Sequence, residues 1–144
     1  MSWDDTQQFE DTQVADAWPR TQIMAIQHIL LVDDSKTELH FLTEMLTKRG
    51  FTVSTAEGGE DALRRLEEQR PDLILMDVVM PGTNGFQLTR TITRDPRWSG
   101  IPVIMCTSKN QETDRVWGMR QGARDYIVKP VDAGELFAKI DALA

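Results

Sequence analysis

Short apolar runs alternate with amphipathic stretches along the chain from residue 28 onward. A short, unbroken apolar run is typical of a parallel strand that is buried on both faces. Apolar residues three and four positions apart are typical of a helix with one buried face. The pattern predicts strands at residues 28–32, 51–56, 73–76, 102–106 and 125–128. It predicts a helix from Ser35 to Gly50 and further helices at residues 60–69, 85–94, 112–121 and from 132 onward.

Five strands that alternate with five helices indicate the α/β class, with a parallel sheet covered by helices on both faces. Two of the helix starts carry recognisable caps. Ser35 with Glu38 matches a capping box, and Asp132 has Glu135 as its capping partner. In a sheet of this kind, ligands bind outside the carboxyl ends of the strands.

The first 26 residues differ from the rest, because they carry five acidic residues against the single Arg20. Their apolar residues are too sparse to anchor a long helix. We therefore expect residues 1–26 to be an acidic, flexible extension, of which residues 1–23 are dispensable. Residues 27–144 are then the folded domain.

Composition narrows the function classes. The 144 residues suit one domain, and the net charge of −7 argues against a nucleic-acid partner, since phosphate backbones attract clustered Lys and Arg. Cys106 is the single cysteine and has no partner for an internal disulfide, which favours a cytoplasmic location. No apolar run approaches the roughly 18 residues that a membrane span needs, and the N-terminus has no export signal.

Polar residues stand where the predicted strands end. Asp33 and Asp34 follow the first strand, Asp77 the third, Thr107 the fourth and Lys129 the fifth. Three close carboxylates repel one another unless a cation joins them or their pKa values rise. Mg²⁺ prefers such carboxylates together with water and phosphate oxygens, and Mn²⁺ is an alternative. A carboxylate can also attack phosphorus to give an aspartyl phosphate, whose charge the cation and Lys129 would neutralise.

With these residues in place, the chain resembles the receiver domains of two-component response regulators over residues 27–144. The motifs that carry the resemblance are Leu31-Val32-Asp33-Asp34-Ser35, Met76-Asp77, Met80-Pro81-Gly82 with Gly85, Thr107-Ser108 and Lys129-Pro130. The resemblance implies a flavodoxin-like, doubly wound (βα)5 fold with a five-stranded parallel sheet in the order 2-1-3-4-5.

The resemblance also implies roles for individual residues. Asp77 would be the phosphoacceptor, and Asp33 and Asp34 would hold Mg²⁺ with it, the backbone carbonyl of Val79 being a further ligand. Three more residues would respond to phosphorylation: the phosphate-binding Lys129, the switch hydroxyl of Thr107 and the switch aromatic Tyr126.

A narrower resemblance lies in Lys109-Asn110-Gln111-Glu112-Thr113-Asp114, Trp117-Gly118 and residues 120–126. These motifs are similar to those of single-domain regulators of type IV pilus twitching motility, the PilH group. The resemblance implies a chemotaxis-like pathway in which a histidine kinase or phosphotransfer domain supplies the phosphoryl group. The fourth helix, fifth strand and fifth helix would then form the face that binds a downstream protein. Because the chain ends just after the last helix, we expect no attached DNA-binding domain.

Two other function classes remain open. A phosphatase of the haloacid-dehalogenase type also forms an aspartyl phosphate, but it needs a second aspartate two residues later, where this chain has Val79. The other class is a receiver-like binding module that works without phosphorylation, or a sink for phosphoryl groups.

Several residues outside the strand ends have simpler interpretations. Trp117 fits a partner surface or the core equally well. We interpret His28 and His40 as structural or solvent-facing, and Cys106 as a small buried residue whose place beside Thr107 leaves room for a redox effect. The methionines are expected in the core: Met76, Met80, Met105 and Met119.

Overall fold

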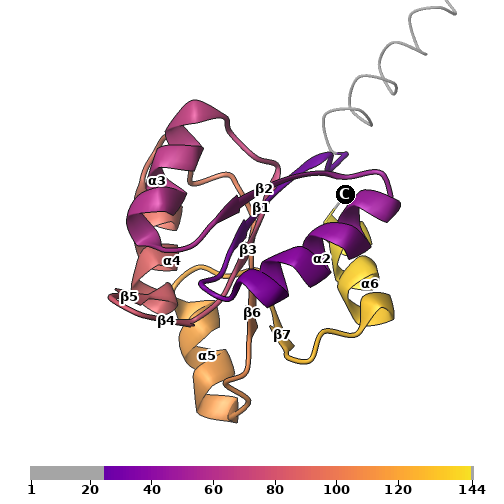
Figure 1. Ribbon diagram of the computed structural model, residues 1–144. Coiled ribbons are helices and arrows are strands. Elements are labelled where there is room, and N and C mark those ends of the chain that lie inside the picture. Colours follow the sequence, from indigo (N-terminus) through magenta and orange to yellow (C-terminus); the bar gives the residue numbers. More distant parts are fainter. Residues whose placement is uncertain (1–24, 144) are drawn as a thin grey trace, which may run out of the picture.

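The computed structural model describes residues 25–143, and these contain one parallel sheet of five strands (Figure 1). The strands are β1 (His28–Val32), β2 (Thr52–Ala56), β3 (Leu73–Met76), β6 (Val103–Thr107) and β7 (Asp125–Val128). Their spatial order is β2-β1-β3-β6-β7, which is 2-1-3-4-5 when the sheet strands are counted along the chain. The predicted fold and strand order are therefore confirmed. The predicted acidic extension lies almost wholly outside the described residues.

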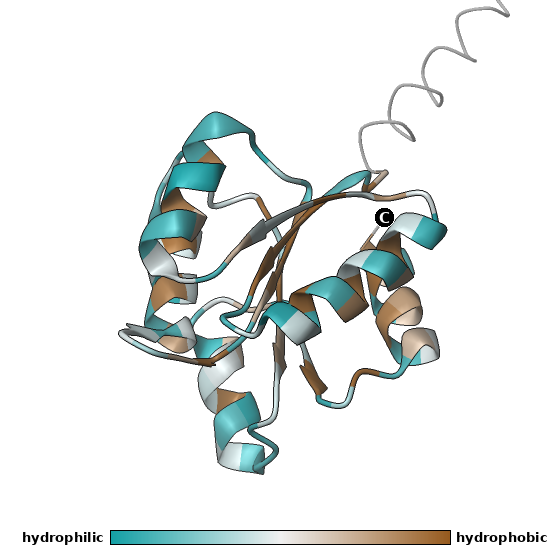
Figure 2. Cartoon of the chain, viewed as in Figure 1, coloured by the Kyte–Doolittle hydropathy of each residue, from teal (hydrophilic) through white to brown (hydrophobic). Residues whose placement is uncertain are grey.

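Helices cover both faces of this sheet (Figure 1). On one face lie α2 (Lys36–Lys48) and α6 (Ala133–Leu143). On the other lie α3 (Gly59–Glu68), α4 (Gly85–Arg94) and α5 (Glu112–Arg120). Figure 2 shows the consequence for hydropathy: the inner strands are hydrophobic, whereas the edge strand β2 is paler and the helices are hydrophilic on their outer sides.

The sheet separates two hydrophobic clusters, because successive side chains of a strand point to opposite faces. In β1, Leu30 and Val32 belong to the cluster beneath α3, α4 and α5, while Ile29 and Leu31 belong to the cluster beneath α2 and α6. All four side chains are buried. This two-sided burial explains why the strand sequences are continuous apolar runs.

Most predicted boundaries agree with the structure to within one residue, as is normal for the ends of helices and strands. A short hairpin, in which β4 (Val79–Met80) pairs with β5 (Thr83–Asn84), was not among the elements that the sequence pattern predicts. Gly82 turns this hairpin with a φ of 70°. The side chain of Asn84 then caps α4, because its oxygen accepts from the backbone N–H of Phe86 at 2.8 Å.

The capping box predicted at α2 forms only in part. The Ser35 hydroxyl accepts from the N–H of Glu38 at 3.2 Å. The N–H of Ser35, however, donates to Asp33 Oδ1 at 2.9 Å instead of to Glu38. The carboxylate of Asp33 has taken the place that the box reserves for the Glu38 side chain.

Two expectations about surface and core residues are resolved by burial. Met76, Met80 and Met105 are in the core as predicted, but Met119 on α5 is 39% exposed, so that prediction was wrong for this residue. Trp117, one of the undecided residues, is 48% exposed. Within residues 25–143, no helix is both long and apolar enough to cross a membrane.

Gly85 provides a test of the packing next to the end of β3. A Cβ at this position would overlap the backbone carbonyl oxygen of Asp77 and lie 2.7 Å from the Cα of Val78. Gly85→Ala should therefore lower the free energy of unfolding by about 3 kcal/mol, because backbone on both sides would have to move. Urea denaturation checks this, with Gly58→Ala as control. A Cβ at Gly58 meets nothing within 4 Å, so that change should be worth less than about 1 kcal/mol, and equal effects would refute the argument.

Candidate functional site

The three predicted carboxylates meet at the carboxyl edge of the sheet. Strands β1 and β3 are neighbours, and Val32 pairs with Met76, so the residues that follow them, Asp33 and Asp77, are brought side by side. Asp33, Asp34 and Asp77 each offer an oxygen within 4.8 Å of the others. Asp33 and Asp77 are buried, whereas Asp34 is exposed, so the cluster opens to solvent on one side.

Backbone N–H groups hold the two buried carboxylates in place. Asp77 Oδ1 accepts from the N–H of Val78 at 2.8 Å. Asp33 Oδ1 accepts from the N–H of Ser35 at 2.9 Å, the bond that displaces the capping box. In each carboxylate this occupies one oxygen and leaves Oδ2 as the atom available to other partners.

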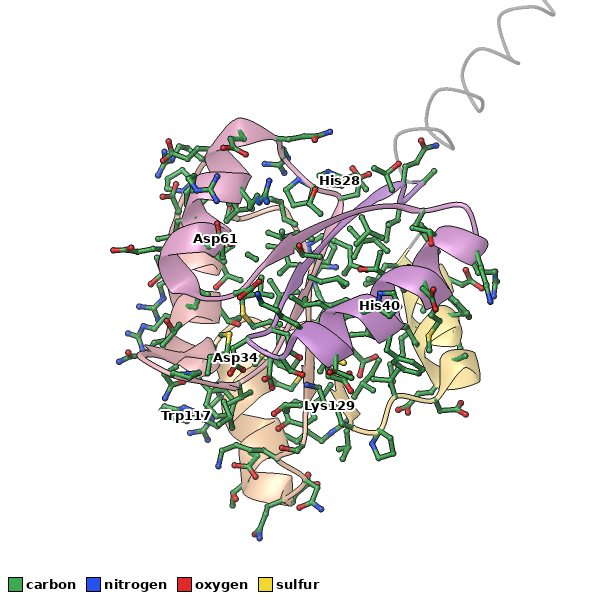
Figure 3. All side chains as sticks on the ribbon, viewed as in Figure 1. His28, Asp34, His40, Asp61, Trp117 and Lys129 are labelled. Carbon is green, nitrogen blue, oxygen red and sulfur yellow. The ribbon has the colours of Figure 1, made fainter. Side chains whose placement is uncertain are left out.

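Lys129 reaches the same place from β7. Its Nζ donates to Asp33 Oδ2 at 2.6 Å and lies 3.8 Å from Asp77 Oδ2. Figure 3 shows Lys129 and Asp34 at one edge of the sheet, whereas His28, at the start of β1, lies at the other end. The prediction that residues far apart in sequence converge on one pocket agrees with this geometry.

The environment changes the pKa values of the two central groups. Burial raises the pKa of Asp77, and the charge of Asp33 adds to this. The positive charge of Lys129 and a hydrogen bond from Thr107 oppose the rise without cancelling it. For Lys129, burial lowers the pKa, but the hydrogen bond to Asp33 and the charge of Asp77 outweigh burial and raise it overall. The surroundings thus favour the charged ammonium of Lys129, whereas the pKa of Asp77 lies above that of a free aspartate.

Thr107 and Tyr126 are joined through one residue that the sequence analysis did not assign to the site. The Thr107 hydroxyl oxygen accepts from the N–H of Lys109 at 3.3 Å. The Tyr126 hydroxyl donates to the carbonyl oxygen of the same Lys109 at 2.8 Å. The Tyr126 ring is buried, and burial raises the pKa of its hydroxyl to about 12, so the phenol remains a donor at neutral pH.

The donor set suits a small divalent cation. Hard cations such as Mg²⁺ take carboxylate oxygens together with water, and the exposed side of Asp34 leaves room for water. The role of the Val79 carbonyl as a further ligand stays a prediction; Val79 itself is 54% exposed and pairs with Asn84 in the β4–β5 hairpin. Cys106 lies beside Thr107 but is buried, and burial raises the pKa of its thiol to about 12, which keeps it unreactive.

Glu38 is a further carboxylate that sequence reasoning interpreted only as a helix cap. Its Oε1 is shielded from solvent and has no hydrogen-bond partner among residues 25–143. Its charge contributes to the raised pKa of Lys129. The sequence does not indicate that the Glu38 side chain turns inward, because its spacing from Ser35 is that of a helix cap.

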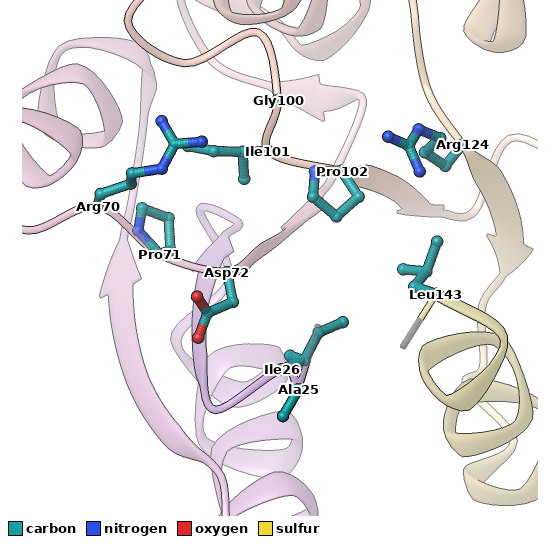
Figure 4. Close-up of a pocket in the computed structure, with 10 residues that line it drawn as sticks. All are labelled: Ala25, Ile26, Arg70, Pro71, Asp72, Gly100, Ile101, Pro102, Arg124 and Leu143. Atoms are coloured by element: carbon teal, nitrogen blue, oxygen red, sulfur yellow. The ribbon is translucent and has the colours of Figure 1, made fainter. Parts of the chain in front are cut away.

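A separate cavity of about 440 Å³ lies at the opposite, amino end of the strands (Figure 4). Arg70, Asp72, Arg124 and Leu143 are among the residues that line it. Asp72 Oδ2 accepts from the N–H groups of Gln27 and His28, both at 2.9 Å, and so fastens the start of β1. None of the predicted site residues lines this cavity.

Known sequences that resemble this chain belong to one family of signalling proteins. Residues 29–141 match the model of the response regulator receiver domain. The chain is 56% identical over 115 residues to Protein PilH of Pseudomonas aeruginosa, a match that covers 80% of this chain and 95% of that protein. It is 44% identical to the transcriptional regulatory protein AfsQ1 of Streptomyces coelicolor, over 80% of this chain but only 50% of that protein.

Solved structures show the same fold. A putative response regulator from Chloroflexus aurantiacus aligns with a TM-score of 0.78 at 30% identity, covering 82% of this chain and 97% of that one. The chemotaxis protein CheY4 of Vibrio cholerae aligns with a TM-score of 0.77 at 28% identity, covering 83% of this chain and 100% of that one.

The raised pKa of Asp77 predicts how this residue affects stability. Between the pKa of the unfolded chain and the higher folded value, the folded state binds more protons, so stability falls as pH rises through that window. In EDTA, Asp77→Asn should therefore raise the free energy of unfolding at pH 7, by about 1 kcal/mol. The gain should shrink as the pH is lowered toward 4. Urea denaturation at both pH values measures this, and a gain independent of pH would contradict it.

Proposed function

The chain belongs to the response regulator receiver family, and on this basis we propose that it is a phosphorylation switch of a two-component pathway. In this proposal Asp77 accepts a phosphoryl group from a histidine kinase or phosphotransfer domain, and the modified protein changes its contacts with other proteins. The observation that carries the proposal is the convergence of three carboxylates within 4.8 Å, with the ammonium of Lys129 beside them.

The proposed chemistry assigns a role to each carboxylate oxygen of Asp77. Because Oδ1 accepts from Val78, Oδ2 is the oxygen that attacks phosphorus. The new O–P bond forms as the N–P bond of a phosphohistidine breaks, and the histidine nitrogen keeps the bonding electrons. Lys129, 3.8 Å from Oδ2, would bind the transferred phosphoryl oxygens.

Asp33, Asp34 and Asp77 would together hold Mg²⁺, or Mn²⁺ in its place, with the backbone carbonyl of Val79 as a further ligand. When bound, the cation neutralises negative charge on the phosphoryl oxygens. The cluster offers the carboxylate oxygens such an ion prefers. Burial raises the pKa of Asp77, and the charge of Asp33 adds to the rise, so a cation beside Asp77 would favour its ionised form.

The switch would run from Thr107 to the surface through Lys109. A phosphoryl group on Asp77 would attract the Thr107 hydroxyl, which accepts from the N–H of Lys109. Since the carbonyl of Lys109 receives the Tyr126 hydroxyl, movement of this segment changes the position of the Tyr126 ring. Gly118 of α5 packs on that ring, because a Cβ there would lie 3.3 Å from Tyr126 Cε1. A change at Asp77 thereby reaches α5.

The face formed by α5, β7 and α6 is the surface we propose for a downstream protein. Large apolar side chains are exposed on α5 and β7: Val116, Trp117, Met119 and Val128. Aromatic and methionine side chains are enriched in protein interfaces. We do not expect a nucleic-acid partner, because the chain carries a net charge of −7.

The pathway we propose is a chemotaxis-like system that controls type IV pilus twitching motility from the cytoplasm, with this chain as a stand-alone regulator. Its support is the likeness to PilH, of which the match covers 95%. A dehalogenase-type phosphatase is disfavoured because Val79 stands where the second aspartate is required. A binding module independent of phosphorylation, or a phosphate sink, is the alternative.

Phosphorylation is tested by incubation with a small phosphodonor and Mg²⁺, followed by intact-mass spectrometry. We expect one phosphoryl group per chain, lost in Asp77→Asn and in EDTA, because the nucleophile and the cation are each required. Asp72→Asn, at the opposite end of the sheet, is a matched control and should be phosphorylated normally. Absence of reaction would support the binding module, and repeated turnover of the donor would support a phosphatase.

The proposed path to α5 is tested by Thr107→Ala. Phosphorylation should still occur, since Asp77 and the cation ligands remain, but the surface should respond much less. Amide NMR shifts of α5 and β7 measured with and without phosphodonor would show this as a reduction of at least about threefold in the phosphorylation-dependent changes, the size expected for coupling between contacting residues. Changes as large as in the unmodified sequence would show that the signal does not pass through Thr107.

A further inference from the structure

One carboxylate oxygen of Glu38 has no hydrogen-bond partner among the described residues, and the proposed switch gives it no role. Buried polar atoms nearly always have a hydrogen-bond partner, and each exception calls for a physical explanation. Glu38 Oε1 is shielded from solvent and has no partner among residues 25–143. The partner predicted for it, the N–H of Ser35, donates to Asp33 instead.

Asp33 is the residue at which two positive charges would compete. Its Oδ1 accepts from Ser35, and its Oδ2 receives the ammonium of Lys129 at 2.6 Å. The same carboxylate belongs to the cluster suited to a divalent cation. A cation and an ammonium repel each other strongly when both lie at one carboxylate oxygen in a buried site. When Asp33 engages a divalent cation, Lys129 loses this acceptor, and Asp77, whose Oδ2 lies 3.8 Å from the ammonium, belongs to the same cation cluster. Lys129 therefore needs an acceptor outside the cluster.

We propose that Glu38 is this acceptor: a positioning residue that receives the Lys129 ammonium when Asp33 turns to a divalent cation. This inference rests on the proposed function, because it assumes that the cluster binds Mg²⁺. The ammonium would have two alternative positions, one on Asp33 and one on Glu38, and Glu38 would hold it ready near Asp77 without obstructing the cation.

The surroundings of Glu38 fit this role. It lies in the first turn of α2, directly after the loop that carries Asp33 and Asp34. Its Oε1 is shielded from solvent, and its negative charge contributes to the raised pKa values of Lys129 and of Cys106, a buried residue of β6 next to Thr107. Three N–H donors on a lysine ammonium allow it to exchange one acceptor for another by a change of side-chain torsions.

The chain contains a matched control at another helix. Glu135 occupies the equivalent position in α6, where its N–H donates to Asp132 Oδ2 at 2.8 Å, just as the N–H of Glu38 donates to Ser35. Glu135 is exposed, however, and lies outside the acidic cluster. Glu135→Gln therefore reproduces the loss of one negative charge in the first turn of a helix without touching Lys129.

The experiment is an NMR titration with Mg²⁺ that follows the amide shifts of Asp34 and Val78 at 0.15 M salt. We expect Glu38→Gln to raise the Kd for Mg²⁺ by at least about threefold, since the displaced ammonium would meet a neutral amide, whereas Glu135→Gln leaves the Kd unchanged. In a Lys129→Met background, no ammonium has to move, so adding Glu38→Gln should change the Kd by less than about 1.5-fold.

Each outcome decides between explanations. An equal effect of Glu38→Gln in both backgrounds would show a general loss of negative charge and would overturn the role in positioning Lys129. An effect no larger than that of Glu135→Gln would do the same. If the unmodified protein binds no Mg²⁺ at all, the proposed function fails together with this inference. Mg²⁺-dependent shifts of the Lys129 side-chain resonances, lost in Glu38→Gln, would be the direct signature of the second position.

Discussion

The repulsion between closely spaced carboxylates is the constraint on which the site depends. Asp33 and Asp77 are buried side by side because β1 and β3 are neighbours, and Asp34 adds a third negative charge at the solvent side. Lys129 brings one positive charge to these carboxylates. The pKa of Asp77 is still raised, first by burial and then by the charge of Asp33. A site in this condition attracts whatever brings positive charge, which is the physical basis for proposing a divalent cation there.

The parallel sheet makes this arrangement possible. All five strands point the same way, so the residues after β1, β3 and β7 and the last residue of β6 reach one edge although they are separated by up to 96 positions in the sequence. The three inner strands, β1, β3 and β6, are buried along their whole length, which leaves their ends as the places where polar side chains meet solvent. Packing close to the edge is tight, and Gly85 fits against the backbone of Asp77 only because it has no side chain.

Short hydrogen-bonded segments connect the strand ends to helices on both faces of the sheet. Lys109 receives the Tyr126 hydroxyl with its carbonyl and donates to Thr107 with its N–H, so one residue links the buried hydroxyl of β6 to the ring beneath α5. On the opposite face of the sheet, the loop after β1 joins Asp33 to the start of α2 through Ser35. Hydrogen bonds thus lead from the acidic cluster to the start of α2 and from Thr107 to the ring beneath α5.

The sequence alone was enough to identify the strands and helices, their α/β alternation and the residues that gather at the strand ends. These features are local: apolar runs, helical spacing and the polar residue that ends each strand. The strand order came with the family resemblance, and the structure and the comparisons agree with it. The short hairpin of β4 and β5 escaped prediction because strands of two residues have no period to detect.

Only the tertiary structure decided which polar groups pair. The Ser35–Glu38 spacing is that of a capping box, yet the nearby Asp33 carboxylate takes the Ser35 N–H and Glu38 turns inward. Met119 and Trp117 stand on α5 at positions whose exposure depends on how that helix rotates against β7, not on their own hydrophobicity. Hydrogen-bond partners and exposed faces are set by distances between segments remote in sequence, and no local pattern carries those distances.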